Sequence, residues 1–80
     1  MTGLQKELAK NYTGKKMRRN SQMSITGISE LLDASYPSAK RKILQNYFTV
    51  DEALSILNTL FIDKSNDMNY FKYLFTEQGE

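Results

Sequence analysis

The sequence predicts an all-α protein, a small bundle of four to five helices. Apolar residues recur at the i, i+3, i+4 spacing of a helix along most of the chain. The strict alternation typical of strands never lasts for more than a few residues. Serine or threonine precedes three of the apolar-striped segments, where it can cap a helix. Because the chain has 80 residues, we expect residues 1–80 to form one domain, with a loose tail at about 76–80.

The first helix is predicted from apolar spacing, and the second from apolar spacing together with its cap and its stop. The first is expected within residues 4–20, where a break near Gly14 would leave the residues after it as a separate turn, since glycine costs up to about 1 kcal/mol relative to alanine. The second is expected at about residues 25–33, with Ser24 as its N-cap and Asp33 as a left-handed stop. Its apolar stripe consists of Ile28, Leu31 and Leu32.

The third helix is predicted from its start and from its face pattern. Ser35 is a suitable N-cap, and Pro37 falls in the first turn, where a missing N–H costs nothing. Ala39 and Ile43 lie four residues apart and are expected to face inward. The other faces are left to Ser38, Lys40, Arg41 and Lys42.

The fourth helix has the clearest start in the chain. The sequence TVDE at residues 49–52 is a capping box, in which Thr49 and Glu52 satisfy each other's backbone N–H groups. We expect this to be the most buried helix, with Val50, Leu54, Leu57 and Phe61 on its inner stripe, widened by Ala53 and Leu60. A fifth helix is expected within residues 66–75, from the apolar residues Met68, Phe71, Leu74 and Phe75.

Charge is segregated along the chain. Residues 1–46 carry nine cations and three acidic residues, a net +6, and residues 47–80 carry two cations and six acidic residues, a net −4. The total is only +2. A field of this kind orients a molecule on a polyanion such as nucleic acid, although clustering of charge on solvated helix faces is the alternative explanation.

Composition argues against several classes of protein. The chain has no cysteine and no histidine, so we expect no disulfide, no zinc site and no other metal or cofactor. We expect no enzymatic activity, because no carboxylate pair, phosphate loop or recognisable nucleophile is present. No long apolar run or signal-peptide pattern occurs, so we expect no membrane contact and a cytoplasmic location.

The segment SITGISELLDASYPSAKRKI, residues 24–43, has the spacing of a helix-turn-helix. Ser29 must be small for the two helices to cross closely, and the outer face of the second helix must be polar and positive to meet phosphates and base edges. The segment resembles phage Cro/CI-type proteins of the lambda-repressor-like family. YFTVDEALSILNTLF, residues 47–61, is similar to the fourth helix of that family. The resemblance covers roughly residues 15–75.

The resemblance implies a DNA-contacting surface. Tyr36, Ser38, Lys40 and Arg41 would face the major groove and Lys42 would lie near the DNA backbone, while Ser24 and Thr26 are candidates for a phosphate at the start of the preceding helix. Charge alone adds four candidates for flanking phosphates: Lys15, Lys16, Arg18 and Arg19. The chain departs from the family pattern at Ile25, where glutamine often contacts DNA, and at Tyr36, where arginine is common.

Each of these features has a plain structural alternative. The Lys-Arg-Lys run and the KKMRR segment can be solvated surface, and Tyr36 can pack against the turn. The phenylalanines are expected in the core or at a dimer surface.

Two functions are therefore weighed. The first is a sequence-specific DNA-binding transcriptional regulator of phage or mobile-element type. It would bind double-stranded DNA as a homodimer, with self-association in residues 47–75. The alternative is a small phage-type protein that uses the same scaffold to bind and inhibit a protein partner.

Overall fold

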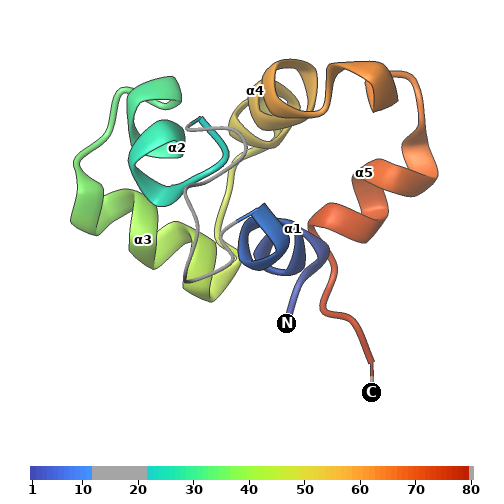
Figure 1. Ribbon diagram of the computed structural model, residues 1–80, viewed down its shortest axis with the longest axis horizontal. Helices are drawn as coiled ribbons and strands as arrows, with labels where there is room; N and C mark the ends of the chain where they lie inside the picture. The colour runs from blue at the N-terminus through green and yellow to red at the C-terminus, as the bar shows by residue number, and fades with distance from the viewer. Residues whose placement is uncertain (12–21, 80) are drawn as a thin grey trace.

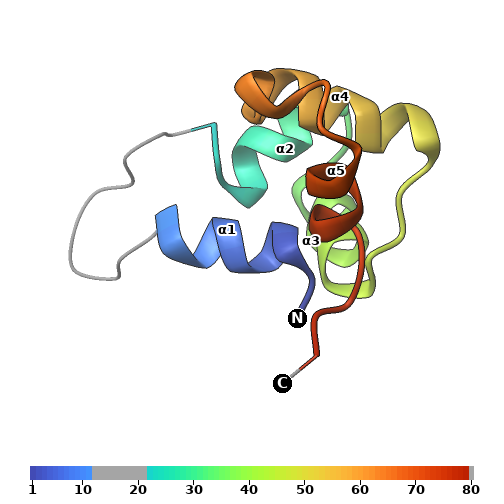
Figure 2. The ribbon, with the colours of Figure 1, turned by 90° about the vertical axis from the view of Figure 1, so that its right-hand side faces the viewer.

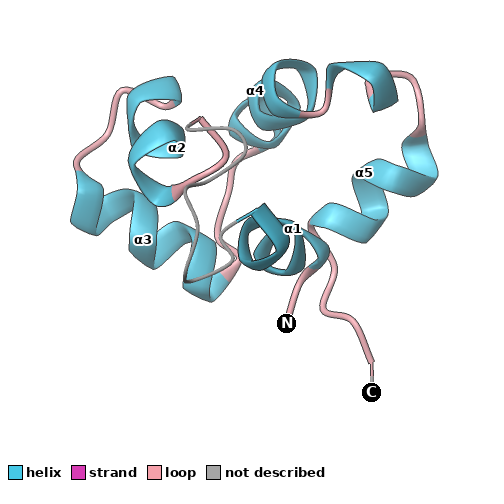
Figure 3. Ribbon diagram, viewed as in Figure 1, coloured by secondary structure: helices cyan, strands magenta, loops and turns pink. Residues whose placement is uncertain are grey.

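The structure, a computed structural model, describes residues 1–11 and 22–79, which form five α-helices and a short 3-10 helix joined by loops (Figures 1 and 3). In chain order these are α1 (Gly3–Asn11), α2 (Ile25–Leu31), α3 (Tyr36–Gln45), α4 (Val50–Leu60), η1 (Ile62–Lys64) and α5 (Met68–Leu74). The only β pairing in the described residues is an isolated bridge between Thr2 and Glu77. The predicted all-α fold of four to five helices is confirmed for the described residues.

The core lies where the five helices meet. Its buried apolar side chains come from every helix: Leu4, Ile28, Ile43, Ile56, Leu57, Phe61 and Leu74. A chain of this length buries only about 60% of the surface that its unfolded form exposes, so few side chains carry the stability.

The pair α2 and α3 has the most extensive packing between helices in the described chain. Ser24 caps α2 by accepting a hydrogen bond from the Gly27 N–H at 3.0 Å, as predicted. The helix ends at Leu31, two residues earlier than expected, and Asp33 follows with a φ of 54°. This left-handed residue reverses the chain so that α3 packs back on α2. Ser29 is buried, and its hydroxyl donates to the Thr26 carbonyl at 2.6 Å.

The third helix begins as predicted. Ser35 caps α3 by accepting from the Ser38 N–H at 3.3 Å, and Pro37 lies in the first turn. Ala39 and Ile43 are buried, which confirms the predicted inward face. Asn46 ends the helix with a left-handed φ of 53°.

The fourth helix begins with the predicted capping box, but its buried face differs from the prediction. Val50 is 70% exposed and Leu54 is also exposed, whereas Ile56, which the predicted stripe omitted, is fully buried. The buried residues of α4 are Ala53, Ile56 and Leu57, so its inner face is rotated about the helix axis relative to the predicted one. The reason is tertiary: α2 covers that side of α4, and nothing in the described chain covers Val50.

The first and last helices pack together, and the chain termini lie close to each other (Figures 1 and 2). The Tyr73 hydroxyl donates to Glu7 Oε2 at 3.0 Å, and burial raises the pKa of Tyr73. Residues 76–79 were expected to be loose, yet Glu77 pairs with Thr2 and the Gln78 N–H donates to the Met1 carbonyl at 2.9 Å. This part of the expected tail is therefore held against the N-terminus.

The predicted extension of the first helix beyond Asn11, including the break at Gly14, lies outside the described residues.

Candidate nucleic-acid interface

The outer face of α3 carries two exposed cationic side chains, Lys40 and Arg41. Ala39 and Ile43 fix the rotation of the helix because both are buried against the core. Arg41 therefore lies on the opposite side of the helix and Lys40 on its flank. No described acidic side chain forms an ion pair with either of them within 4.0 Å. The two charges are available to a partner outside the chain.

Lys42 is placed differently from its two cationic neighbours. Its side chain turns toward α4, and Nζ lies 2.9 Å from Glu52 Oε2 and 3.1 Å from Oε1. Only 23% of each side chain is exposed. The Lys42 hydrogen bonds, together with the Thr49 N–H, lower the pKa of Glu52. Lys42 therefore ties α3 to α4, and this pairing reduces the positive charge that it presents to solvent.

Of the two predicted phosphate contacts at the start of α2, one is exposed and the other is buried. Thr26 is exposed in the first turn of the helix. Ser24 is buried, and its oxygen already accepts the capping hydrogen bond from Gly27. Ser24 thus positions the helix, and Thr26 is the better placed of the two for contact with a partner.

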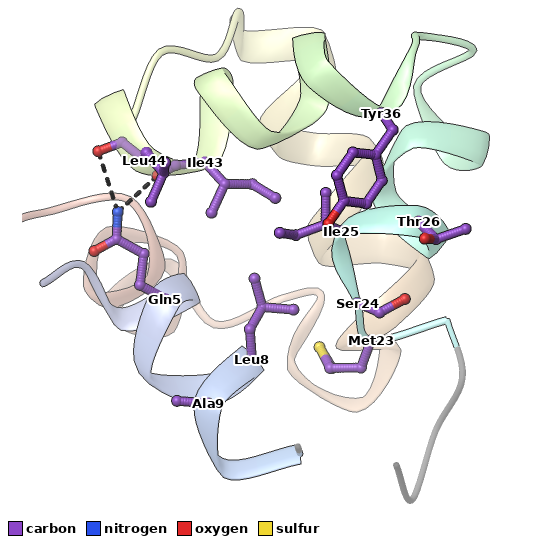
Figure 4. Close-up of a pocket in the computed structure, with 10 residues that line it drawn as sticks. All are labelled: Gln5, Leu8, Ala9, Met23, Ser24, Ile25, Thr26, Tyr36, Ile43 and Leu44. Carbon is purple, nitrogen blue, oxygen red and sulfur yellow. Dashed lines mark hydrogen bonds between the residues drawn. The ribbon is translucent and has the colours of Figure 1, made fainter. Parts of the chain in front are cut away.

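Tyr36 and Ser38 occupy the first turn of α3. Ser38 is half-buried. Tyr36 is 49% exposed, and Figure 4 shows its ring directed from α3 toward Ile25 of α2. This position agrees with the alternative in which the ring packs near the turn, and it also leaves an edge open to solvent. The candidates Lys15, Lys16, Arg18 and Arg19 lie outside the described residues.

An apolar groove of about 340 Å³ lies beside α3, and its lining contains no charged residue. It lies between α1, the start of α2 and α3 (Figure 4), and its apolar lining includes Leu8, Met23, Ile25, Ile43 and Leu44. Leu44 is 64% exposed although it belongs to α3. None of the lining residues is acidic. The sequence analysis did not predict this groove, because its walls come from three segments that are far apart in the chain.

Gln5 holds one wall of the groove in place. Its amide nitrogen donates to the carbonyls of Ile43 at 2.7 Å and Leu44 at 3.4 Å, which satisfies acceptors at the end of α3 (Figure 4). Gln5 and Thr2 also exchange hydrogen bonds at 2.9 and 3.2 Å, as in a capping box. The sequence TGLQ at residues 2–5 carries this signal, and the sequence analysis missed it.

Two further kinds of site are not found in the described chain. Residues 1–11 and 22–79 contain no group of three or more carboxylate side chains that could hold a metal ion. Within the same ranges, no helix has the length and apolar character needed to cross a membrane. Comparisons with models of protein families, with curated proteins and with solved structures found no match.

Proposed function

We propose that the protein is a sequence-specific DNA-binding transcriptional regulator, in which α2 and α3 act as a helix-turn-helix and α3 enters the major groove. The observation that carries this proposal is the exposure of Lys40 and Arg41 on a helix whose inner face, Ala39 and Ile43, is buried. The left-handed Asp33 between the two helices supports it, since the motif requires a sharp reversal of the chain at this point.

The proposed contacts with DNA are of two kinds, those to base edges and those to phosphates. Arg41 is the residue proposed to read a base edge, because its planar guanidinium forms bidentate hydrogen bonds with guanine. Lys40 and Thr26 are proposed to contact phosphates, which give affinity and register but no sequence information directly. Tyr36 would contribute at the edge of this surface through its hydroxyl. Lys42 supports the site through Glu52 rather than through DNA.

One domain of this size reads few base pairs, so the proposal includes a homodimer on a palindromic site. The surface that best supports self-association is an exposed aromatic face around the α3–α4 loop and α5. It consists of Tyr47, Phe48, Val50, Phe71 and Phe75, of which Tyr47 and Val50 are the most exposed. The regulator would act on the nucleoid in the cytoplasm, on genes of a phage or mobile element.

The test is selection of bound duplexes from a random pool, followed by titration of the selected site with variants. Arg41→Ala is expected to cost about 1–3 kcal/mol of binding free energy and to relax the preference at one base pair. Lys40→Ala is expected to weaken binding to all sequences and to reduce the slope of log K against log salt by about 0.9.

Lys72→Ala is the matched control, since Lys72 is also exposed but lies on α5, remote in sequence from α3. It is expected to leave sequence preference unchanged. If no duplex is enriched and binding at moderate salt is absent, the proposal fails.

The apolar groove supports a second candidate, a module that binds a protein partner. A Leu44 side chain that is largely exposed on α3 is an unusual neighbour for a DNA backbone and an ordinary element of a protein interface. Lys40→Ala with Arg41→Ala would then leave partner binding intact, whereas Leu44→Asp would abolish it.

A further inference from the structure

The groove has a complementary surface on the opposite end of the same molecule. We define this acidic corner as Ile62, Asp63, Asp67 and Met68, where the chain turns from α4 through η1 into α5. Ile62 is 69% exposed and Met68 is 63% exposed, and both carboxylates are exposed beside them. The corner therefore presents two large apolar side chains beside two carboxylates, and the exposed Lys64 between them in the sequence leaves residues 62–68 with a net charge of −1.

The groove offers the space for such side chains, and positive charge lies next to it on α3. Its lining is largely apolar and contains neither an acidic nor a basic residue. Lys40 lies one turn after Tyr36 and one turn before Leu44, so it shares their face of α3 and borders the groove. Arg41 is exposed beside it. Apolar side chains that carry carboxylates at their edge fit these requirements.

The two surfaces cannot meet within one chain. In Figure 1 the corner lies beyond α4 and α5, at the end of the long axis opposite to α3. Lys64 lies within the span of the corner, between Asp63 and Asp67, and its Nζ is 5.5 Å from the centre of the Tyr70 ring. A second copy can bring its corner to the groove and still leave its own groove open, which is the geometry of a head-to-tail contact.

We propose that the groove binds the acidic corner of a second copy, so that the chain associates head to tail in addition to any symmetric dimer. In the described residues, 1–11 and 22–46 carry five cations and three acidic residues, a net +2, and 47–79 carry two cations and five acidic residues, a net −3, which favours this orientation over the reverse one. Two apolar side chains and a few charges make a small interface, and a small interface gives a weak and transient contact.

This contact has a consequence that rests on the proposed function. Tyr36 lines the groove and Lys40 borders it, and both belong to the surface proposed for DNA. A copy whose groove is occupied would therefore lose part of its DNA-binding surface. Head-to-tail association and DNA binding compete.

The experiment mixes two variants that are each defective on one surface. The first, Ile62→Asp with Met68→Asp, keeps its groove and is labelled with nitrogen-15. The second, Leu44→Asp, keeps its corner and is unlabelled. All three substituted side chains are exposed, so the variants are expected to fold, and their thermal midpoints are checked first.

Adding the unlabelled Leu44→Asp protein at about millimolar concentration is expected to shift the amide signals of Leu8, Ile25 and Leu44 in the labelled protein in a saturable manner. Added salt at about 0.5 M is expected to reduce these shifts, since charge pairs are screened. Ser55→Asp, placed in the unlabelled Leu44→Asp protein, is the matched control. It adds the same charge at an exposed residue of α4 that belongs neither to the corner nor to the proposed dimer surface, and it is expected to leave the shifts unchanged.

Three results would overturn the proposal. The first is that the groove signals do not move. The second is that they move equally when the unlabelled partner also carries Ile62→Asp and Met68→Asp. The third is that the Ser55→Asp control removes the shifts, which would mean that the groove binds a different surface. No DNA is present in this experiment. A negative result would therefore count against head-to-tail association and not against the proposed DNA binding.

Discussion

Helices α3 and α4 are of similar length, and both begin with a side-chain cap, yet they have opposite roles. The helix α4 buries Ala53, Ile56 and Leu57 and anchors the core. The helix α3 buries the small Ala39 together with Ile43 and leaves Lys40, Arg41 and Leu44 exposed. A helix that presents side chains to a partner needs only a narrow buried face, whereas a helix that supports the domain needs large buried side chains.

The largest effect that we predict lies on α4. Ile56→Ala should lower the free energy of unfolding by about 2–5 kcal/mol, since Ile56 is fully buried and its truncation leaves a cavity. Leu54→Ala, two residues away but exposed, should cost much less. Urea denaturation of both variants measures the difference. Equal losses would mean that the inner face of α4 is not the one that we describe.

On α3 the protein should instead be destabilised by a larger side chain at a buried position, because the core has no space for the added volume. Ala39→Leu should cost about 1–3 kcal/mol, because Ala39 is fully buried at the inner face of the helix. Gln45→Leu, at an exposed position of the same helix, is the control and should change stability little. If Ala39→Leu stabilises the protein in thermal unfolding, the packing of α3 is looser than the structure indicates.

The two caps should differ in strength. Thr49→Ala should cost about 1 kcal/mol, since it removes one half of a reciprocal capping box with hydrogen bonds of 2.9 and 3.1 Å. Ser35→Ala should cost less, because its single capping bond is 3.3 Å long. Chemical denaturation of both variants ranks them. A larger loss for Ser35→Ala would contradict this comparison.

The smallest effect is the dependence of stability on pH through the ion pair that joins α3 to α4. Because the pKa of Glu52 is lowered in the folded protein, the stability from this group is present above its ordinary pKa of 4.5 and is lost as pH falls through the lowered value. Glu52→Gln keeps the capping pattern but removes the charge. It should therefore flatten the acidic limb of a plot of thermal midpoint against pH.

Asp51→Asn is the control for this measurement, since Asp51 is adjacent and exposed. It should leave the contribution of Glu52 unchanged. If the acidic limb is equally steep in Glu52→Gln, the Lys42–Glu52 pair contributes no measurable stability. This is common for ion pairs near the surface of a protein.

The sequence predicted the helix starts well because each depends on residues that are three positions apart. Ser24, Ser35 and Thr49 were all identified as caps, and all three accept the expected hydrogen bonds. The left-handed Asp33 was also predicted, from its residue type and its position. Of the candidate site, Lys40 and Arg41 are exposed as their spacing from Ala39 and Ile43 required.

What the sequence by itself determined is thus the class of fold, the helix starts and the inner face of α3, because local hydrogen bonds and helical periodicity fix them. Only the tertiary structure decided which side of α4 is buried, and that Lys42 turns to Glu52 rather than to solvent. The apolar groove and the pairing of Thr2 with Glu77 were decided in the same way. These features join residues that are ten to more than seventy positions apart, and the relative placement of helices, not local spacing, brings such residues together.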